Sequence, residues 1–517
     1  MAAQPRTAPP AMALVALGLS IVAVANDFTA LNVTIPAIER SFDTSLSTAQ
    51  WVLNAYTLVF AMLIVPGGRI SDLLGAERAF LVGAGIFVAF SCVAAAAPTV
   101  GVLIAGRALM ALGGALIWPA CLSMTFTAFG PDGAGRAGAF VIGVAGLANA
   151  LGPIDGGVLV DVASWRFVFL LNLPIGLFAM AVVARRGGAE RPEREAAGID
   201  VAGIALLAAG LLAFLVALDQ APLWGWGDPR VVGLLAGAAL ALVAFAALQL
   251  HKGTRALIPT DVIRNRDFAA SCAAIALMGV PFGALLLFLP QLVQKVLGGN
   301  ALQAGLAVLP LLLTYALASF QAAKLNERLG ARVVLGAGAI AMTAGTALLA
   351  LVPEGLAYVD LVPGMVVFGA GVGLFYSTVT TAAVVALSAV RQGLAGGVLY
   401  MFQLVGLSVG VGLTTTIATS VTDARLQDRV DRLGAAAVED RLTLQGLLAG
   451  TESAGDAAAR LGVGAADRLE EVLRHAFVSG VKTGFAVDAA LAALGALFTI
   501  AFVGGKLRHR PTEDTRG

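Results

Sequence analysis

Long runs of apolar residues alternate with short polar or charged segments along the whole chain. A helix of about 20 largely apolar residues crosses the roughly 30 Å hydrocarbon core of a bilayer. Fourteen runs fit this size, so the pattern predicts an all-α polytopic membrane protein with fourteen transmembrane helices. The runs are residues 11–36, 48–70, 79–97, 99–123, 138–162, 167–184, 199–218, 231–250, 268–293, 302–323, 333–351, 361–387, 394–419 and 485–503.

Composition agrees with this pattern and excludes several functions. Of the 517 residues, 59% are hydrophobic and only 13% are charged, whereas a soluble domain has about 25% charged residues. The net charge of +1 leaves no basic excess to bind nucleic acid. The three cysteines lie in apolar runs without metal-ligand or disulfide spacing, so we expect core packing and no metal site.

The positive charges of the short loops predict the orientation of the chain. The two termini and the short loops on their side carry twenty Lys or Arg residues, and the opposite short loops carry only Arg40, Arg166, Arg230 and Lys295. Both termini are therefore expected in the cytoplasm of a cell whose plasma membrane the protein crosses. The long connection 421–475 on the outer side has apolar residues at helical spacing, at 426, 430 and 433 and again at 469, 472 and 473. These predict a short helical cap, either a functional lid or an inert insertion.

An internal repeat divides the chain into two halves. Residues 69–72 and Gly75 match residues 324–327 and Gly330 at an offset of 255 positions, each in a turn between the second and third helix of a six-helix block. Parallel repeats of this kind build two-halved secondary transporters. We expect an N-terminal half at 1–184, a two-helix insert with its linkers at 185–267, and a C-terminal half at 268–517.

Three ionisable residues lie inside predicted spans, where a charge is costly and needs a partner or a wet cavity. At about 1.5 Å per residue, Asp27, Arg107 and Asp155 all lie at a similar depth in the outer half of the membrane. An arginine can keep one carboxylate charged while burial favours the protonated form of the other. The three residues are candidates for proton coupling, and the alternative is that either acid only caps backbone or meets interfacial water. A fourth acid, Asp488, is expected at the interface, near the outer end of the last span.

Five ordered motifs resemble those of the major facilitator superfamily, and within it the fourteen-span drug:proton antiporters. Residues 26–36 are similar to the first-helix signature of that group, and residues 68–75 resemble the loop motif. Arg107 stands in the fourth-helix motif, and residues 143–157 match the fifth-helix antiporter motif. Residues 165–167 with 172–176 complete the set. The sequence departs from the loop motif at Leu73, Ala76 and Glu77, where basic residues are usual.

The resemblance implies a major facilitator fold, with two six-helix halves and two extra central helices, and the export of small hydrophobic or cationic compounds such as drugs in exchange for protons. It implies a gating role for the loop residues Asp72, Gly75, Arg78, Glu327 and Gly330. The antiporter motif adds Gly152, Pro153, Gly156 and Gly157, and the Gly152-Pro153 pair also predicts a bend, because proline removes a backbone hydrogen bond.

Other residues inside the spans are candidates to line a substrate cavity, although each can equally serve in helix packing: Asn54, Tyr56, Asn149, Tyr376, Phe402 and Gln403. The chain has no G-x-x-x-x-G-K-[ST] motif for an ATP-driven pump, and its three histidines lie outside the spans, so neither a pump nor an embedded enzyme is expected. We expect a monomer in the lipid bilayer that binds a small molecule and protons, needs no cofactor and is driven by the proton gradient. A dedicated exporter of one endogenous metabolite is the alternative.

Overall fold

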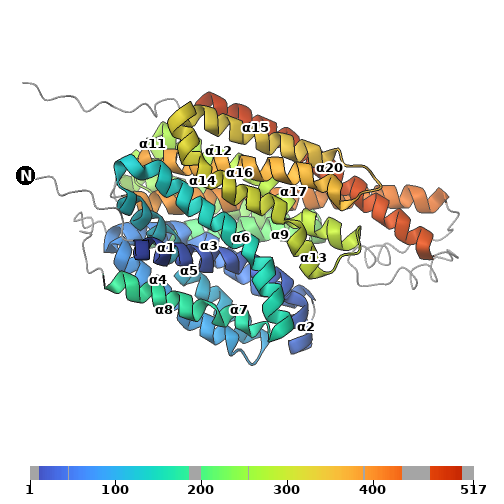
Figure 1. Ribbon diagram of the computed structural model, residues 1–517, viewed down its shortest axis with the longest axis horizontal. Helices are drawn as coiled ribbons and strands as arrows, with labels where there is room; N and C mark the ends of the chain where they lie inside the picture. Colours follow the sequence, from blue (N-terminus) through green and yellow to red (C-terminus); the bar gives the residue numbers. More distant parts are fainter. Residues whose placement is uncertain are drawn as a thin grey trace, which may run out of the picture.

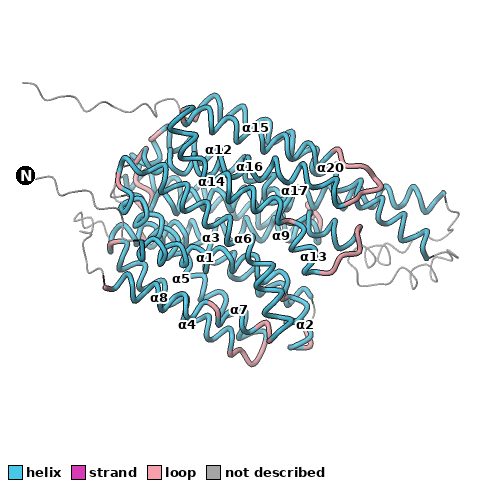
Figure 2. The backbone as a smooth tube through the Cα atoms, viewed as in Figure 1, coloured by secondary structure: helices cyan, strands magenta, loops and turns pink. Residues whose placement is uncertain are grey.

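The computed structural model describes residues 11–44, 46–185, 200–253, 256–387, 391–432 and 466–503. Within these ranges all regular secondary structure is helical (Figure 1, Figure 2). Fourteen stretches are long and apolar enough to cross a membrane, which confirms the predicted number of spans. Because this number is even, α1 (Ala11–Ala30) begins on the same side of the membrane on which α20 (Ala466–Phe502) ends. We call this side the terminal face and the other side the far face.

The first group of helices packs around α5 and α6 and forms the lower layer of Figure 1. Within it, α1 packs against α5, α6 and α8, and α5 packs against α3 and α4. After α1 it comprises η1 (Leu31–Val33), α2 (Ile35–Phe42), α3 (Leu46–Leu74), α4 (Ala76–Ala95), α5 (Val100–Phe129), η2 (Pro131–Gly133), α6 (Ala134–Val162), α7 (Arg166–Leu170) and α8 (Asn172–Ala184).

The second group repeats this arrangement in the upper layer of Figure 1. Here α16 packs against α14 and α15, and α20 packs against α12, α15 and α17. The two groups meet along two seams, α6 against α14 and α3 against α17. The group comprises α11 (Thr260–Arg264), α12 (Arg266–Lys295), α13 (Ala301–Ala307), α14 (Leu309–Leu329), α15 (Ala331–Ala350), α16 (Tyr358–Val385), α17 (Gln392–Arg432) and α20.

Two further helices, α9 (Val201–Trp224) and α10 (Pro229–Lys252), pair with each other between the two groups in the chain. α9 packs against both α3 and α17, so it lies along one seam. Asp200 caps α9 by accepting a hydrogen bond from the amide of Gly203, and it also binds Lys252 and Gln249 of α10. Burial raises the pKa of the Asp200 carboxyl, but these hydrogen bonds outweigh it and hold the pKa below its ordinary value.

The predicted boundaries of several spans differ from those of the helices, and the first and last spans are the clearest cases. The first was predicted to reach residue 36, but α1 ends at Ala30 and a separate helix α2 follows on the far face. Pro36 explains the break, because proline lacks an N–H and fits only the first turn of a helix. The last span was predicted to begin at residue 485, but its apolar helix extends from Leu473 to Phe502. The polar residues His475 and Lys482 made the earlier turns of this helix look like a loop.

The last correction moves Asp488 into the membrane. It lies 14 residues before the end of α20, about 21 Å along the helix, and its side chain is fully buried, so the interfacial position predicted for it is wrong. The helical spacing predicted after residue 421 is confirmed for Leu426, Val430, Leu469, Val472 and Leu473, but these residues extend α17 and α20 instead of forming a separate cap. The extended ends project from the far face in Figure 1. Leu433 and the rest of the predicted cap up to residue 465 lie outside the described residues.

Candidate functional site

A buried ion pair joins the first and fourth spans. Asp27 of α1 is 2% exposed and Arg107 of α5 is 1% exposed, and the Arg107 Nη1 atom donates a hydrogen bond to Asp27 Oδ2. The Arg107 Nε atom also donates to the carbonyl oxygen of Val52 in α3, at 3.0 Å. The guanidinium carbon lies 4.2 Å from the centre of the Tyr56 ring. One arginine therefore holds three helices together at the depth predicted for both charged residues.

Asp155 lies close to this pair but has different partners. Its Oδ2 atom accepts a hydrogen bond from Asn26 Nδ2 at 2.8 Å, and its Oδ1 atom accepts one from the Gly156 amide at 2.8 Å. Among the described residues, Asp155 and Arg107 are joined by neither a hydrogen bond nor an ion pair. Two consecutive residues of α1, Asn26 and Asp27, thus contact α6 and α5 respectively, so the two acids are linked through adjacent positions of one helix.

Two acceptor atoms at this site have no hydrogen-bond partner among the described residues. They are Asn26 Oδ1 and Asp27 Oδ1, and both are buried. A buried acceptor without a donor is costly, and such atoms point to a site that a ligand or a proton can complete. Sequence reasoning missed Asn26, although a polar residue beside Asp27 inside a span was a usable signal.

The small residues of the predicted antiporter motif bring α6 close to two neighbours. A Cβ atom on Gly152 would lie 2.0 Å from Thr29 Oγ1, and one on Gly156 would lie 2.5 Å from the carbonyl oxygen of Ala30, so both glycines allow contact with the end of α1. On another face, Gly157 lies against Leu302 and Pro153 lies against Gly305, both in the second group of helices. Pro153 is inside α6, which continues as one helix to Val162.

The loop residues of the repeat share a backbone conformation but differ in their contacts. Gly75 and Gly330 have φ values of +88° and +84°, in the region that favours glycine. Asp72 is 8% exposed, and its carboxylate accepts hydrogen bonds from the amides of Gly393 and Leu394 at 3.0 and 2.9 Å. These amides form the N-terminus of α17, so Asp72 joins the two groups of helices at the terminal face and interacts favourably with the helix dipole.

The remaining predicted loop residues do not share this contact. Arg78 and Glu327 are both exposed, and neither makes a hydrogen bond or an ion pair with another described residue. The contact made by Asp72 was not predictable as such, because its donors are backbone amides at a helix start distant in the sequence. The close approach depends on Gly68, where a Cβ atom would lie 2.5 Å from the Gly393 carbonyl oxygen.

Aromatic rings extend from the ion pair to the seam between α3 and α17. Phe28 contacts Tyr56 and Phe60 with ring centres 5.1 and 5.4 Å apart, and Phe60 contacts Tyr400 at 5.6 Å. Tyr400 belongs to α17, and the centre of its ring lies 4.5 Å from that of Trp118. We call these five residues the N-side aromatic cluster. Phe28 and Phe60 were not among the predicted cavity residues, because an aromatic ring in a membrane span usually serves only in packing.

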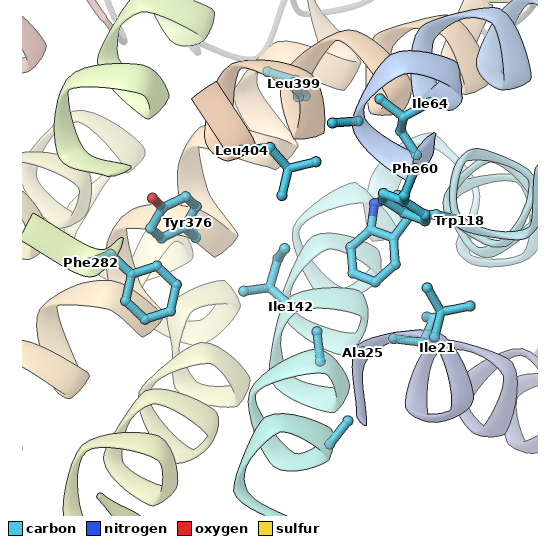
Figure 3. Packing of buried hydrophobic residues seen from close by; sticks show 14 of the residues in the cluster. Ile21, Ala25, Phe60, Ile64, Trp118, Ile142, Phe282, Tyr376, Leu399 and Leu404 are labelled. Atoms are coloured by element: carbon cyan, nitrogen blue, oxygen red, sulfur yellow. The ribbon is translucent and has the colours of Figure 1, made fainter. Parts of the chain in front are cut away.

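A second aromatic cluster lies in the other group of helices. Phe282 is its centre. The centre of its ring lies 6.1, 6.2 and 5.9 Å from the ring centres of Tyr315, Phe368 and Tyr376. We call these four residues the C-side aromatic cluster. Figure 3 shows Phe282 and Tyr376 on one side of Ile142, and Trp118 with Phe60 on the other. The hydroxyl groups of Tyr56 and Tyr376 are buried without a hydrogen-bond partner in the described structure.

The other predicted cavity residues are half-buried: Asn54, Asn149, Phe402 and Gln403.

The architecture defines a polytopic membrane protein of the two-halved transporter type, with buried ionisable groups in its first half. The chain belongs to the Major Facilitator Superfamily, whose sequence profile matches residues 17–410. It is 30% identical to the tetracenomycin C resistance and export protein of Streptomyces glaucescens over 94% of this chain and 91% of that protein. It is 33% identical to the puromycin resistance protein of Streptomyces alboniger over 78% of this chain and 80% of that protein.

A solved structure supports the fold. The human organic anion transporter MFSD10 (TETRAN) superposes with a TM-score of 0.60 at 12% identity, over 96% of this chain and 100% of that chain. The sequence-based assignments of family and of fold class are thereby confirmed.

Proposed function

We propose that this protein exports small hydrophobic or cationic compounds, such as drugs or antibiotics, in exchange for protons by alternating access. The observation that carries the proposal is the pair of adjacent residues Asn26 and Asp27, which contact Asp155 and Arg107 inside the membrane. Its relatives that are named as resistance and export proteins support the substrate class. The terminal face is then cytoplasmic, in the plasma membrane of a bacterium, as the loop charges favour.

Protonation of Asp27 gives the coupling step. The carboxylate is charged while it pairs with Arg107, and a proton that binds it removes the attraction that holds α1 to α5. The unpartnered Asp27 Oδ1 atom is the position at which a proton binds without first breaking the bond to Arg107. Arg107 keeps its charge throughout, because its side chain does not lose a proton in proteins. Proton binding thus changes the contact between two helices of the first half.

The substrate binds between the two aromatic clusters. Their rings offer flat apolar faces and, for cations, the attraction of a π-system. Asp155 is half-buried and forms no ion pair with a lysine or arginine among the described residues, so it supplies a counter-charge for a cationic substrate or serves as a second proton site. The contact of Asp72 with α17 closes the cytoplasmic end in this conformation. This contact breaks, and the cytoplasmic end opens, when the halves rock apart. The protein works as a monomer. It needs no cofactor, because the proton gradient supplies the energy for transport.

The test is transport by the purified protein in proteoliposomes. We expect an imposed pH gradient to drive substrate movement, and ATP to have no effect. One charge crossing 100 mV is worth about 2.3 kcal/mol, which is enough for tens-fold accumulation per proton moved electrogenically. Substrate movement that ignores the pH gradient and requires ATP contradicts the proposal.

Substrate range decides between a multidrug exporter and a dedicated exporter of one endogenous metabolite. The relatives carry names of both kinds, a multidrug resistance protein of Mycobacterium tuberculosis and the cephamycin export protein of Amycolatopsis lactamdurans. A growth-inhibition panel in a host that lacks its own pumps measures this range. Protection against several unrelated hydrophobic or cationic compounds supports the multidrug function, and protection against a single compound supports the alternative.

A further inference from the structure

The fully buried carboxyl group of Asp488 lies in the second half of the molecule, outside the site described above. Its Oδ2 atom accepts a hydrogen bond from Thr414 Oγ1 of α17 at 2.8 Å, and its Oδ1 atom is buried with no partner among the described residues. Neighbouring positions are apolar: Gly484 of α20 lies against Thr414, and the Phe485 ring contacts Phe288 of α12. Asp488 therefore lies in an apolar layer between α12, α17 and α20.

Among the described residues of the helices packed against it, no lysine or arginine forms an ion pair with Asp488. On α17 the first charged residue after Thr414 is Asp423, nine positions further and about 14 Å along the helix. Lys482 lies six positions before Asp488 on α20 itself, on a different face of the helix. Three helices pack against α20: α12, α15 and α17. Their other titratable residues lie near helix ends or at other levels: Arg266, Asp267, Cys272 and Lys295 on α12, Arg332 on α15, and Tyr400 and Arg425 on α17.

The environment of Asp488 differs from that of Asp27, which forms an ion pair with Arg107. An ionised carboxylate in an apolar interior without a cation is far costlier than the neutral acid. The surroundings therefore favour the neutral acid in this conformation, with the proton on the unpartnered Oδ1 atom. The hydrogen bond from Thr414 fits this state, because a neutral carboxyl group still accepts through its other oxygen.

We propose that Asp488 is a second proton-binding site of the transport cycle, located in the C-terminal half and controlled by the position of α17. The inference rests on the proton exchange proposed above. α17 carries both the amides bound by Asp72 and the Thr414 hydroxyl bound by Asp488. When α17 leaves Asp72 it also shifts relative to α20, so Thr414 moves away from Asp488 and the carboxyl layer opens to water. The acid then loses its proton to that water on the cytoplasmic side and becomes a carboxylate, and a proton from the far face neutralises it again when α17 returns.

Infrared spectroscopy of the protein in lipid tests the protonation state directly. We expect a protonated-carboxyl C=O band that disappears in Asp488→Asn, shifts in frequency in Thr414→Val, and remains in Asp27→Asn. The band should lose intensity when substrate shifts the protein to the other conformation. A band that neither pH nor substrate changes would mean a permanently neutral, structural acid and would overturn the proposal. The Thr414→Val measurement keeps the test informative even where Asp488→Asn fails to insert.

Proton release on substrate addition, measured with a pH indicator in weak buffer, gives the second test. We expect the wild-type protein to release more protons per substrate than Asp488→Asn, and Asp488→Glu to release as many as the wild type. Equal release by the wild type and Asp488→Asn overturns this inference alone. If the wild type itself releases no proton, the proposed antiport fails instead, so the two failures are distinguishable.

Discussion

In the N-terminal half, Asp27, Arg107 and Asp155 place three ionisable side chains inside the membrane, whereas the residues 255 positions later are Phe282, Val362 and Gly410. Phe282 is the centre of the C-side aromatic cluster, so an aromatic network stands where the first half has an ionic one. The near-identical φ values of Gly75 and Gly330 show that the offset holds for the backbone of this turn. We infer that the first half responds mainly to charge and the second half mainly to the shape of an apolar substrate. Asp488 is the exception in the second half.

The same contrast holds for the two copies of the loop. Asp72 is buried against the start of α17, and its counterpart Glu327 is exposed. The turn is therefore conserved as a backbone shape within this chain, while only one copy carries the contact between the halves. Each of the following experiments tests one part of this division.

The largest effect is expected for Asp27→Asn. The amide cannot bind a proton at transport pH, and it leaves the Arg107 charge buried without a carboxylate, so transport driven by a pH gradient should be lost. Proteoliposomes with an imposed gradient measure this, and thermal unfolding in detergent checks that the variant is folded. Gradient-driven transport at the wild-type rate would show that the ionic network of the first half is not the coupling device.

Asp155→Asn should have the next largest effect, and a selective one if Asp155 is a counter-charge. A hydrogen bond or contact to a charged group is worth about 1.5 to 3 kcal/mol, so export of cations should fall about tenfold or more while neutral substrates are spared. If Asp155 carries a coupled proton, both kinds of substrate should be impaired. Asp155→Leu is the comparison variant, and wild-type rates in both variants would make Asp155 a bystander.

Asp72→Asn should have an effect of intermediate size on transport. An amide has one acceptor oxygen for the two amides of α17 and no charge for the helix dipole, a loss of about 1 kcal/mol. That lowers the ratio of molecules with a closed cytoplasmic end to molecules with an open one about fivefold. We expect lower turnover and normal insertion into the membrane. Glu327→Gln is the matched control in the second half and should leave turnover unchanged. Equal effects of the two variants would remove the difference between the two loops.

Phe282→Leu should have the smallest effect. Leucine keeps most of the apolar surface but removes a ring with which an aromatic substrate can pair; one such pair is worth about 0.5 kcal/mol at its lower limit, so the KM for aromatic substrates should rise about twofold. Protons moved per substrate should not change. A change in that ratio with an unchanged KM would place coupling, and not substrate shape, in the C-side aromatic cluster.

Apolar runs of sufficient length were enough to predict all fourteen spans, because the cost of exposing polar backbone to lipid leaves few alternatives. The depth of Asp27 and Arg107 along their helices also placed them correctly at one level. Depth does not give the direction in which a side chain points around its helix, so the pairing of Asp155 with Asn26 was not predictable. Asp488 was misplaced because Lys482 and His475 hid the first turns of its helix. The donors that Asp72 binds are backbone amides, which leave no mark in a sequence.

The position of Tyr400 divides helix α17 into two unequal arms. Gly393, beside Asp72, lies 7 residues before Tyr400 at the seam, and the end of the helix at Arg432 lies 32 residues after it. At 1.5 Å per residue these arms are roughly 10 and 48 Å long. If the helix pivots as a rigid rod at Tyr400, a displacement of about 1 Å at Gly393 becomes roughly 5 Å at the tip. A spectroscopic label near residue 432 therefore reports an amplified signal of a release that takes place at the opposite face of the membrane.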